Sequence, residues 1–461
     1  MLVLTSIGNT MKKYLSAGLL VVCSFSIYAS ECISHIEEKN FKKALDKCTQ
    51  EATKGDNKAQ YYLGVMYDEG AGVEQDQLKA VYWYTKAAEQ GEPNAQYNLA
   101  LMYNNGDGIE QDKQKAVYWY TTAAEQGHTK AQYQLAVMYY EGDSVKLDKQ
   151  NAVYWYTRAA KQGDSRSQYN LAFMYNNGDG IKPDKQKAIY WYTLAAENGH
   201  SKAQYNLALM YNNGNGIEPD KQKALYWYTI AAEQGQSSAQ YNLALMYHQG
   251  DGIKQDTPKA IYWYTRAAEE GESDAQFNLA LMYSNGDGIE PDKQKAVYWY
   301  TKAAEQGLSR AQYNLGNMYY KGDGIEPDKQ KAVYWYIKSA KQDESNAQYN
   351  LALMYDMGVG IELDKQKAVY WYTKAAEQGH YGAQFSLAIK YYYGESVEQD
   401  KIKSVYWFTK AAKQGNAEAQ YNLALMYAQG DGVEQNKFLA KEYFKQSCEQ
   451  GFKKACNKLK K

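Results

Sequence analysis

Tryptophan recurs with a constant period along this chain, and that period constrains the fold more than any other feature. The sequence has ten tryptophans, and the first two, Trp83 and Trp119, are 36 residues apart. The others follow at the same spacing: Trp155, Trp191, Trp227, Trp263, Trp299, Trp335, Trp371 and Trp407. A fixed period of this size indicates a tandem repeat array, in which each unit packs only against its neighbours. We therefore expect the indoles to be spread along the array and not gathered in one globular core.

Each repeat is predicted to consist of two helices joined by a short turn. In the repeat that begins at Ala95, the first helix has an inner stripe at helical spacing, made of Ala95, Leu99, Ala100 and Tyr103. The stripe of the second helix is Ala116, Trp119, Tyr120, Ala123 and Ala124. Asp112 is a favourable N-cap for this helix, and Gly127 ends it in the left-handed conformation, which Asp343 tolerates in another repeat. The sequence therefore predicts an all-α solenoid of helix-turn-helix repeats.

The two ends of the chain depart from the repeat. Residues 1–30 are predicted to be a secretory signal peptide, because a basic start precedes a short apolar run and the small residue Ala29. The chain starts at Met1 or Met11, and cleavage is expected after Ala29 or Ser30. An uncleaved anchor is the alternative, although the apolar run is short for a membrane span. Residues 31–58 are predicted to be a capping half-repeat, 59–451 eleven repeats, and 452–461 a capping stub.

Four cysteines outside the signal peptide lie in pairs at the two ends of the array. Cys32 and Cys48 are equally distant from a predicted turn, and Cys448 and Cys456 flank another turn. Two positions equidistant from the turn of a helical hairpin lie opposite one another, so we prefer two local disulfides among the three possible connectivities. A redox or metal site is the alternative, but it needs closer spacing or histidine partners. Disulfides also agree with a periplasmic or secreted bacterial protein.

Composition and motifs argue against several classes of function. The formal net charge is −1, so no general field attracts nucleic acid or an acidic membrane. His128, His200 and His380 share one loop position, but multiples of the repeat separate them, so they are expected at the surface and without a shared metal. No serine, cysteine or carboxylate stands out as a nucleophile with its own base. We therefore predict no catalytic residue, no metal site and no cofactor.

The repeat pattern resembles a known family. The segment Ala-Gln-x-x-Leu-Ala-x-x-Tyr-x-x-Gly-x-Gly-Ile, followed by Lys-Ala-x-x-Trp-Tyr-x-x-Ala-Ala-x-x-Gly, is similar to the Sel-one-like repeat (SLR) family, a relative of the tetratricopeptide repeat. The resemblance implies a right-handed α-solenoid with a tetratricopeptide-like superhelix and an adaptor function. The C-terminal Cys448 and Cys456 resemble the cysteine-rich bacterial branch, for which β-lactam hydrolysis has been claimed. The central repeats of this chain contain no cysteine.

The resemblance places the first helix of each repeat on the concave face, where Tyr97, Asn98, Leu101, Asn104 and Asn105 would face a groove. Asparagine recurs there although it is a mediocre helix former, at Asn98, Asn170, Asn206, Asn242, Asn278, Asn314, Asn350 and Asn422. An amide donates to a peptide carbonyl and accepts from its N–H, so this row is predicted to clamp an extended partner chain. The alternative is that the amides bond to neighbouring repeats or are copies left by duplication. The repeat with Lys390 and Tyr392 departs most from the others and is predicted to contact the partner as well.

Together these features predict an exported, monomeric scaffold that binds a protein or peptide in its concave groove. Its role would be that of an adaptor, an envelope protein or a host-interaction protein, without nucleic acid and without membrane insertion after signal cleavage. A β-lactamase-type hydrolase and a structural spacer in an envelope assembly are the alternatives. Turnover of nitrocefin by the purified protein would favour the hydrolase.

Overall fold

A computed structural model of the chain describes residues 30–459, and the predicted signal peptide lies outside this range except for Ser30. The regular secondary structure of the described residues is helical throughout. The first helices of the repeats, called A helices here, are α3 (Asn57–Glu69), α5 (Pro93–Asn105), α7 (Thr129–Glu141), α9 (Ser165–Asn177), α11 (Ser201–Asn213), α13 (Ser237–Gln249), α15 (Ser273–Asn285), α17 (Ser309–Lys321), α19 (Ser345–Met357), α21 (Tyr381–Tyr393) and α23 (Ala417–Gln429). The second helices, called B helices, are α4 (Gln77–Glu89), α6 (Lys113–Glu125), α8 (Lys149–Lys161), α10 (Lys185–Glu197), α12 (Lys221–Glu233), α14 (Thr257–Glu269), α16 (Lys293–Glu305), α18 (Lys329–Ala340), α20 (Lys365–Glu377), α22 (Lys401–Lys413) and α24 (Lys437–Glu449). The terminal helices are α1 (Glu31–Glu37), α2 (Phe41–Thr53) and α25 (Lys453–Leu459).

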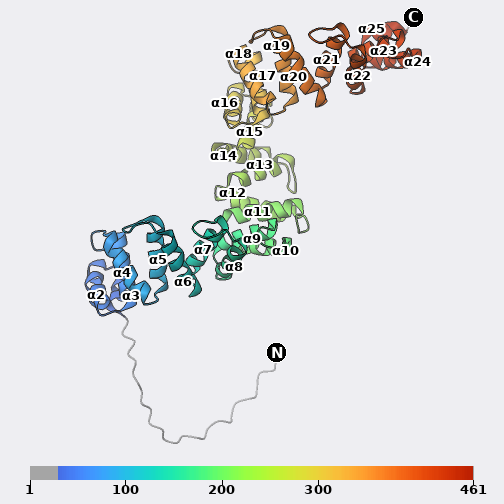
Figure 1. Cartoon of the computed structure of the whole chain (residues 1–461). Helices are drawn as coiled ribbons and strands as arrows, with labels where there is room; N and C mark the ends of the chain where they lie inside the picture. The colour runs from blue at the N-terminus through green and yellow to red at the C-terminus, as the bar shows by residue number, and fades with distance from the viewer. Residues whose placement is uncertain (1–29, 460–461) are drawn as a thin grey trace, which may run out of the picture. The chain divides into compact units, whose positions relative to one another are not determined.

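The helices form two compact units, with α1–α9 in unit 1, which ends at Lys182, and α10–α25 in unit 2, which begins at Pro183. Within each unit the helices are stacked in chain order, and each packs on the helices before and after it (Figure 1). The tryptophans lie on ten different B helices, α4 to α22. The predicted all-α solenoid is therefore confirmed.

Local sequence determines where the helices begin and end. The carboxylate of Asp112 accepts a hydrogen bond from the Lys115 N–H over 3.0 Å, which caps α6 as predicted. Gly127 follows the C-terminus of this helix with φ +91°, and Asp343 takes the same left-handed conformation with φ +61°. The A helix α5 ends at Gly106, whose N–H donates to the carbonyl of Met102. The turn chemistry of the repeat is thus the chemistry that its sequence predicts.

The core of each repeat is built from small residues and one ring. In α5 and α6 the alanines of the predicted stripes are fully buried, as is Leu99. Tyr120 is buried, whereas Trp119 keeps part of its surface exposed and packs on the core that α4 and α5 share. Tyr103, which was predicted as an inner residue, is only half-buried, and Met102 occupies the core instead. The tyrosine and not the indole is therefore the most enclosed ring of the B helix.

A column of buried glutamines, not anticipated from the sequence, connects successive repeats. Gln96 is 2% exposed, and its Nε2 donates to the carbonyl of Ala88 near the end of α4 over 3.1 Å. Its Oε1 accepts a hydrogen bond from Nε2 of Gln126, which follows α6, over 2.8 Å. The first of these bonds recurs in every repeat, at Gln60, Gln132, Gln168, Gln204, Gln240, Gln276, Gln312, Gln348, Gln384 and Gln420. These amides satisfy C-terminal helix carbonyls that would otherwise be buried without a partner.

Two glutamines of this column, Gln240 and Gln420, have a buried Oε1 without a hydrogen-bond partner among the described residues, and only at Gln240 is the donor side chain itself replaced. Glu270 stands where Gln126, Gln162 and Gln234 donate to the buried glutamine of their repeat. A glutamate has no N–H to donate, and Oε1 of Gln240 is buried without a hydrogen-bond partner among the described residues.

We predict that Glu270→Gln stabilises the protein, because it supplies the donor that Gln240 lacks. The free energy of unfolding should rise by about 1 kcal/mol, the net value of one hydrogen bond to a buried acceptor. Urea unfolding followed by far-ultraviolet circular dichroism measures the change. Glu269→Gln, an equal change of charge at the neighbouring exposed residue, is the control and should leave the unfolding curve unchanged. Equal effects of the two substitutions would show that charge and not the missing donor is responsible.

Both predicted disulfides are present. Cys32 and Cys48 link α1 to α2, with Cα atoms 4.5 Å apart, and both residues are fully buried. Cys448 and Cys456 link α24 to α25, with Cα atoms 4.8 Å apart. Each bond joins a seven-residue terminal helix to the helix beside it. Terminal helices of a repeat array have only one neighbour, so a covalent link holds them where packing is weakest.

Reduction of the disulfides should release the two terminal helices selectively. Loops of this size are worth about 3 kcal/mol when they are closed, so backbone amides of α1 and α25 should exchange hydrogen much faster in reductant. Hydrogen exchange read by mass spectrometry tests this, with helices α11–α16 as the internal control. Uniform acceleration along the whole chain would contradict a local role for the disulfides.

Candidate partner-binding groove on the A helices

The residues predicted to face a groove lie together on one side of the A helices. In α5, Tyr97, Asn98, Leu101 and Asn104 are half-buried, and Asn105 is exposed. Their spacing places them on adjoining turns of the same helix face. The equivalent positions of the other A helices form what is called the A-helix groove below, within each unit.

A cavity of the same design lies in this groove in each unit. The unit 1 cavity has a volume of about 270 Å³ and is lined by Tyr133, Val137, Tyr140, Glu141, Tyr156, Tyr169, Asn170, Phe173 and Met174. The unit 2 cavity has a volume of about 330 Å³ and is lined by Tyr313, Asn317, Tyr320, Lys321, Tyr336, Asn350, Leu353, Met354 and Met357. Eight of the positions correspond, because they differ by 180 residues, or five repeats. Each cavity therefore lies between two successive A helices, with a B-helix tyrosine between them.

The asparagine column forms part of the cavity walls but also makes internal contacts. Nδ2 of Asn206 is 3.3 Å from the hydroxyl of Tyr192 in the preceding repeat, and Asn278 repeats this contact with Tyr264 over 3.4 Å. Nδ2 of Asn242 donates to the backbone carbonyl of Ser238 in its own helix and lies 3.5 Å from the hydroxyl of Tyr205 in the preceding repeat. Bonding to neighbouring repeats, the alternative interpretation of the column, is therefore observed at these positions. Asn98, Asn170 and Asn350 nevertheless line cavities, so their amides also border open space.

The tyrosine column next to it forms a wall of rings. The Tyr97 ring lies 5.8 Å from the buried ring of Tyr120 and 4.7 Å from the stacked imidazole of His128. Burial raises the pKa of Tyr97, and burial raises the pKa of Tyr300 in the buried column to about 12. These hydroxyls consequently stay protonated and neutral across the physiological range. The tyrosine and asparagine columns of the groove present neutral rings and amides, which suit an extended polypeptide.

Tyr392, a predicted partner-binding residue, lies at the groove edge and is held in place. Its hydroxyl donates to Oδ2 of Asp431 in the next repeat over 3.0 Å, and Nζ of Lys401 lies 5.4 Å from its ring centroid. The carboxylate that accepts this bond raises the pKa of Tyr392. Tyr140 has the same contacts, with Asp179 and Lys149, so the arrangement recurs in both units.

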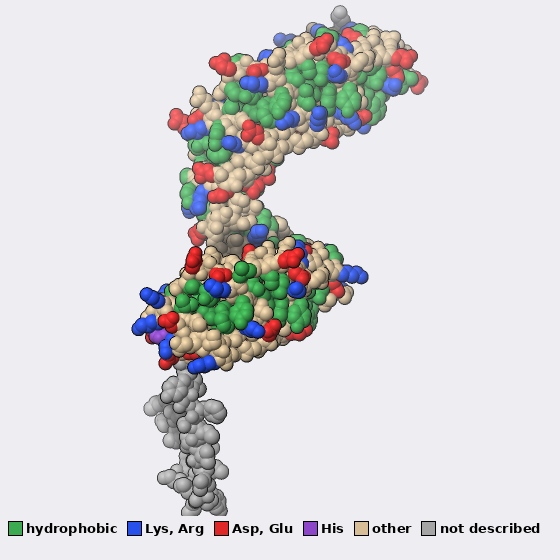
Figure 2. Space-filling view, turned by 60° about the vertical axis from the view of Figure 1, so that its left-hand side comes forward, with side chains coloured by type: hydrophobic (Ala, Val, Ile, Leu, Met, Phe, Trp, Pro, Cys, Tyr) green, Lys and Arg blue, Asp and Glu red, His purple; other side chains and the backbone are tan. Residues whose placement is uncertain are grey.

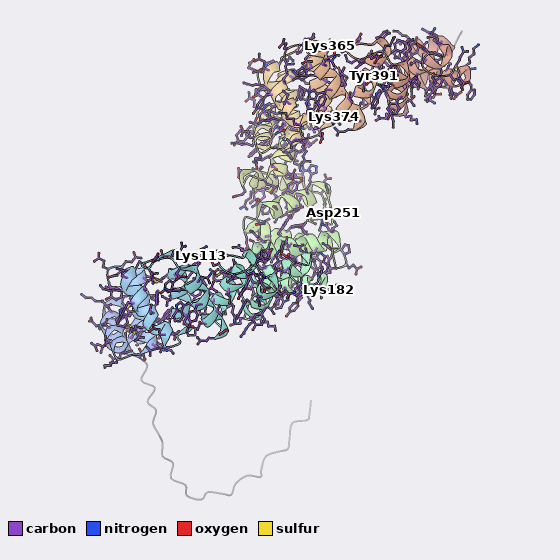
Figure 3. The ribbon with its side chains drawn as sticks, viewed as in Figure 1. Lys113, Lys182, Asp251, Lys365, Lys374 and Tyr391 are labelled. Atoms are coloured by element: carbon purple, nitrogen blue, oxygen red, sulfur yellow. A yellow bond between two sulfur atoms is a disulfide. The ribbon has the colours of Figure 1, made fainter. Side chains whose placement is uncertain are left out.

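Lys390, the other predicted residue of this repeat, is not on the surface. Its side chain replaces the buried methionine of the other A helices and is 3% exposed. Its Nζ pairs with Asp356 over 2.8 Å, and Asp356 also pairs with Lys365, which is labelled in Figure 3. Burial opposes ionisation of Asp356, but the two lysines outweigh it and lower its pKa. Lys390 therefore joins two repeats internally and does not offer its charge to a partner.

A row of lysine-aspartate pairs connects the repeats along the edge of the B helices. Lys113 pairs with Asp143 over 2.8 Å, and Lys221 pairs with Asp251 over 2.6 Å; Lys113 and Asp251 are labelled in Figure 3. Each pair joins the start of a B helix to the turn of the next repeat. Since these side chains are about half exposed, each pair contributes little to stability but orients the turn.

The opposite side of the stack carries exposed tyrosines. Tyr118 on α6 is 61% exposed and packs edge-on against the indole of Trp119, with ring centroids 4.9 Å apart. Equivalent tyrosines on the other B helices between α4 and α22 are similarly exposed. Figure 2 shows hydrophobic side chains, tyrosine included, gathered in broad patches on the visible face of the molecule. These exposed tyrosines, called the B-helix row, lie on the outside of each repeat and not in the A-helix groove.

The predicted surface histidines have a structural role as helix caps. Nδ1 of His128 accepts the Ala131 N–H over 3.1 Å at the start of α7, and His380 caps α21 in the same way. Burial lowers the pKa of both imidazoles, so they are neutral at neutral pH. Asn416 caps the first helix of the following repeat in the same way, with its side-chain oxygen as the acceptor. Within residues 30–459, no group of three or more His, Cys, Asp or Glu side chains is placed to hold a metal ion.

Asn317 is a cavity residue that the sequence analysis missed. It occupies the position of Leu101, where the other A helices of the array carry an apolar residue. Its Oδ1 accepts hydrogen bonds from the hydroxyl of Tyr336 over 2.7 Å and from Nδ2 of Asn350 over 3.3 Å. A polar residue in an otherwise apolar column was the available signal.

Comparison with known proteins identifies the repeat. The Sel1 repeat model matches residues 57–92, 93–128, 129–164, 165–200, 201–236, 237–272, 273–308, 309–344, 345–380, 382–416 and 417–452. The crystal structure of c5321, described as a protective antigen present in uropathogenic Escherichia coli strains and displaying an SLR fold, is 38% identical, covers 90% of this chain and 91% of its own, and has a TM-score of 0.81. A Sel1 repeat protein from Oxalobacter formigenes is 34% identical, covers 67% of this chain and 89% of its own, and has a TM-score of 0.53. No curated protein sequence matches the chain. Among the described helices, none is long and apolar enough to cross a membrane.

The histidine caps should make stability depend on pH. The unfolded-state pKa of histidine is about 6.5, and the folded-state pKa of His128 and His380 is lower. The folded state therefore binds fewer protons, and the free energy of unfolding falls as pH drops below the unfolded value and through the folded-state pKa. His128→Asn with His380→Asn, which introduces at both positions the cap that Asn416 forms, should keep both caps at low pH.

Thermal unfolding near pH 7.5 and near pH 5 tests this prediction, since both values flank the histidine pKa of about 6.5. The double variant should lose less stability than the wild type by about 1 kcal/mol per cap. Equal losses in the two proteins would mean that other groups control the pH dependence.

Proposed function

This chain belongs to the Sel1 repeat family, and on that premise we propose that it is an exported scaffold which binds an extended segment of a protein partner along the A-helix groove. Sel1 repeat solenoids are scaffolds that typically mediate contacts between proteins. The observation that carries the proposal is the recurrence of one cavity design in both units, at positions five repeats apart. Both cavities are lined by the columns of Tyr97, Asn98 and Leu101, which are the columns expected to face a partner.

The chemistry of the groove supports a polypeptide as the ligand. Rings such as Tyr133 and Tyr313 offer apolar area with few rotatable bonds, and amides such as Asn170 and Asn350 can both donate and accept. An extended chain presents a carbonyl or N–H at every residue, which matches a row of amides better than a single compact ligand does. The internal contacts of Asn206 and Asn278 are long, so exchange of those contacts for bonds to a partner costs little.

Two further features support export. The disulfides at both ends persist in oxidising compartments such as the periplasm or the extracellular space. The predicted signal peptide precedes the first of them in the sequence. Neither the hydrolase nor the spacer alternative is favoured by an observation on the described residues.

The groove proposal predicts that the amides of the central repeats are needed for partner capture. In the test, immobilised protein captures partners from an extract of the native envelope, and mass spectrometry identifies them. The triple variant Asn206→Ala, Asn242→Ala and Asn278→Ala should capture at least about tenfold less, since each lost hydrogen bond weakens binding by about 0.5–1.5 kcal/mol.

The matched control changes exposed B-helix tyrosines of the same repeats, with Tyr226→Ser, Tyr262→Ser and Tyr298→Ser. It should capture the same partner as the wild type. A partner that is lost by the tyrosine variant and kept by the asparagine variant would place binding on the opposite side of the stack and end the groove proposal. Circular dichroism confirms that both variants are folded.

A further inference from the structure

The two cavities carry opposite charges at the same position. Glu141 lines the unit 1 cavity, and Lys321, five repeats later, lines the unit 2 cavity. Lys321 is exposed, and no described carboxylate forms an ion pair with it. Aspartate and glutamate are absent from the lining of the unit 2 cavity, and lysine and arginine are absent from that of the unit 1 cavity.

A second lysine beside the unit 2 cavity lacks the acid that its counterparts have. Lys149 pairs with Asp179 of the next repeat in unit 1, but Val359 stands at the corresponding position for Lys329. The side chain of Lys329 instead donates to the backbone carbonyl of Tyr320, and its Nζ lies 3.5 Å from the centroid of that ring. Lys329 thus has no ion pair among the described residues, and its charge lies against a ring that lines the cavity.

The polar groups of the unit 2 cavity are also available as donors. Asn317 replaces Val137 of unit 1, and its Oδ1 is occupied by Tyr336 and Asn350. No described residue accepts a hydrogen bond from its Nδ2 group. In unit 1 the hydroxyl of Tyr140 is engaged by Asp179, whereas Val359 offers no acceptor to Tyr320. At the three positions that differ in charge or hydrogen bonding, unit 2 therefore has more positive charge or more free N–H and O–H groups.

We propose that the unit 2 cavity binds the side-chain carboxylate of an aspartate or glutamate in the extended partner segment. Lys321 and Lys329 provide the complementary charge, and Nδ2 of Asn317 and the Tyr320 hydroxyl donate hydrogen bonds to the carboxylate oxygens. Leu353, Met354 and Met357 contact the methylene groups of the acidic side chain. Charge-assisted hydrogen bonds are about twice as strong as neutral ones, so one such anchor fixes the register of an otherwise unspecific peptide. The inference rests on the proposed groove function and adds its specificity.

The test selects peptides on the full-length chain, expressed with its N-terminal segment so that processing takes place. The probe is a phage-displayed library of random peptides of about twelve residues, which span about 40 Å when extended. Peptides enriched on the wild type should be rich in aspartate and glutamate. For the best of them, exchange of the anchoring acid for its amide should weaken binding about tenfold, as measured by fluorescence polarisation.

Two variants at the cavity and one control locate the effect. Val359→Asp restores the lysine-aspartate pair found in other repeats, and Lys321→Glu reverses the rim charge; each should abolish the preference for acidic peptides. Glu269→Lys changes the charge by the same amount at an exposed residue of α14 that lines neither cavity, and it should leave that preference intact. Acidic enrichment that persists in both unit 2 variants would overturn the inference while the groove function stands. If no peptide is enriched on any of the proteins, the groove function fails, and the inference fails with it.

Discussion

The buried tyrosine of the B helix is the residue on which packing and polarity both depend. The Tyr84 ring is 1% exposed and lies so close to α3 that a Cβ on Gly64 would be 2.7 Å from its Cδ1 atom. Gly316 and Tyr336 have the same relation, so the A helix needs a small residue wherever it crosses this ring. Close approach of the helices excludes water from the ring, and each repeat obtains its core from one aromatic side chain and a set of alanines.

Burial of that ring also places its hydroxyl inside the stack of helices, where the hydroxyl needs a hydrogen-bond partner. A buried hydroxyl without a partner is costly. The hydroxyl of Tyr192 accepts a hydrogen bond from Asn206 of the next repeat. The hydroxyl of Tyr84 donates to Asp68, and that of Tyr336 donates to Asn317, each within its own repeat. The asparagine column is thereby explained in part by packing. The same amides reach the A-helix groove, so residues that hold the repeats together also form the surface offered to a partner.

Recognition in such an array depends on departures from the repeat. A perfectly regular groove would bind an extended chain equally well in every register. Asn317, Lys321 and Val359 depart from their columns within one neighbourhood, and together they make the unit 2 cavity unlike its counterpart in unit 1. Asp356 and Lys390 are also exceptions, but they satisfy each other inside the stack. Of these exceptions, only Asn317, Lys321 and Val359 change the chemistry of the surface.

The sequence by itself determined the period, the two helices of each repeat, their caps at Asp112 and Gly127, and both disulfides. These features depend on residues within a few turns of one another, where helical spacing and capping chemistry act. It also indicated which columns of the A helix lie outside the core, because buried alanine and leucine mark the core side. The tertiary structure alone decided which polar side chains are buried. Gln96 accepts a hydrogen bond from Gln126, thirty residues later, and Lys390 pairs with Asp356 on another A helix. Such partners are remote in sequence, and only the stacking of helices fixes their distance, so no local pattern distinguishes a buried amide or lysine from an exposed one.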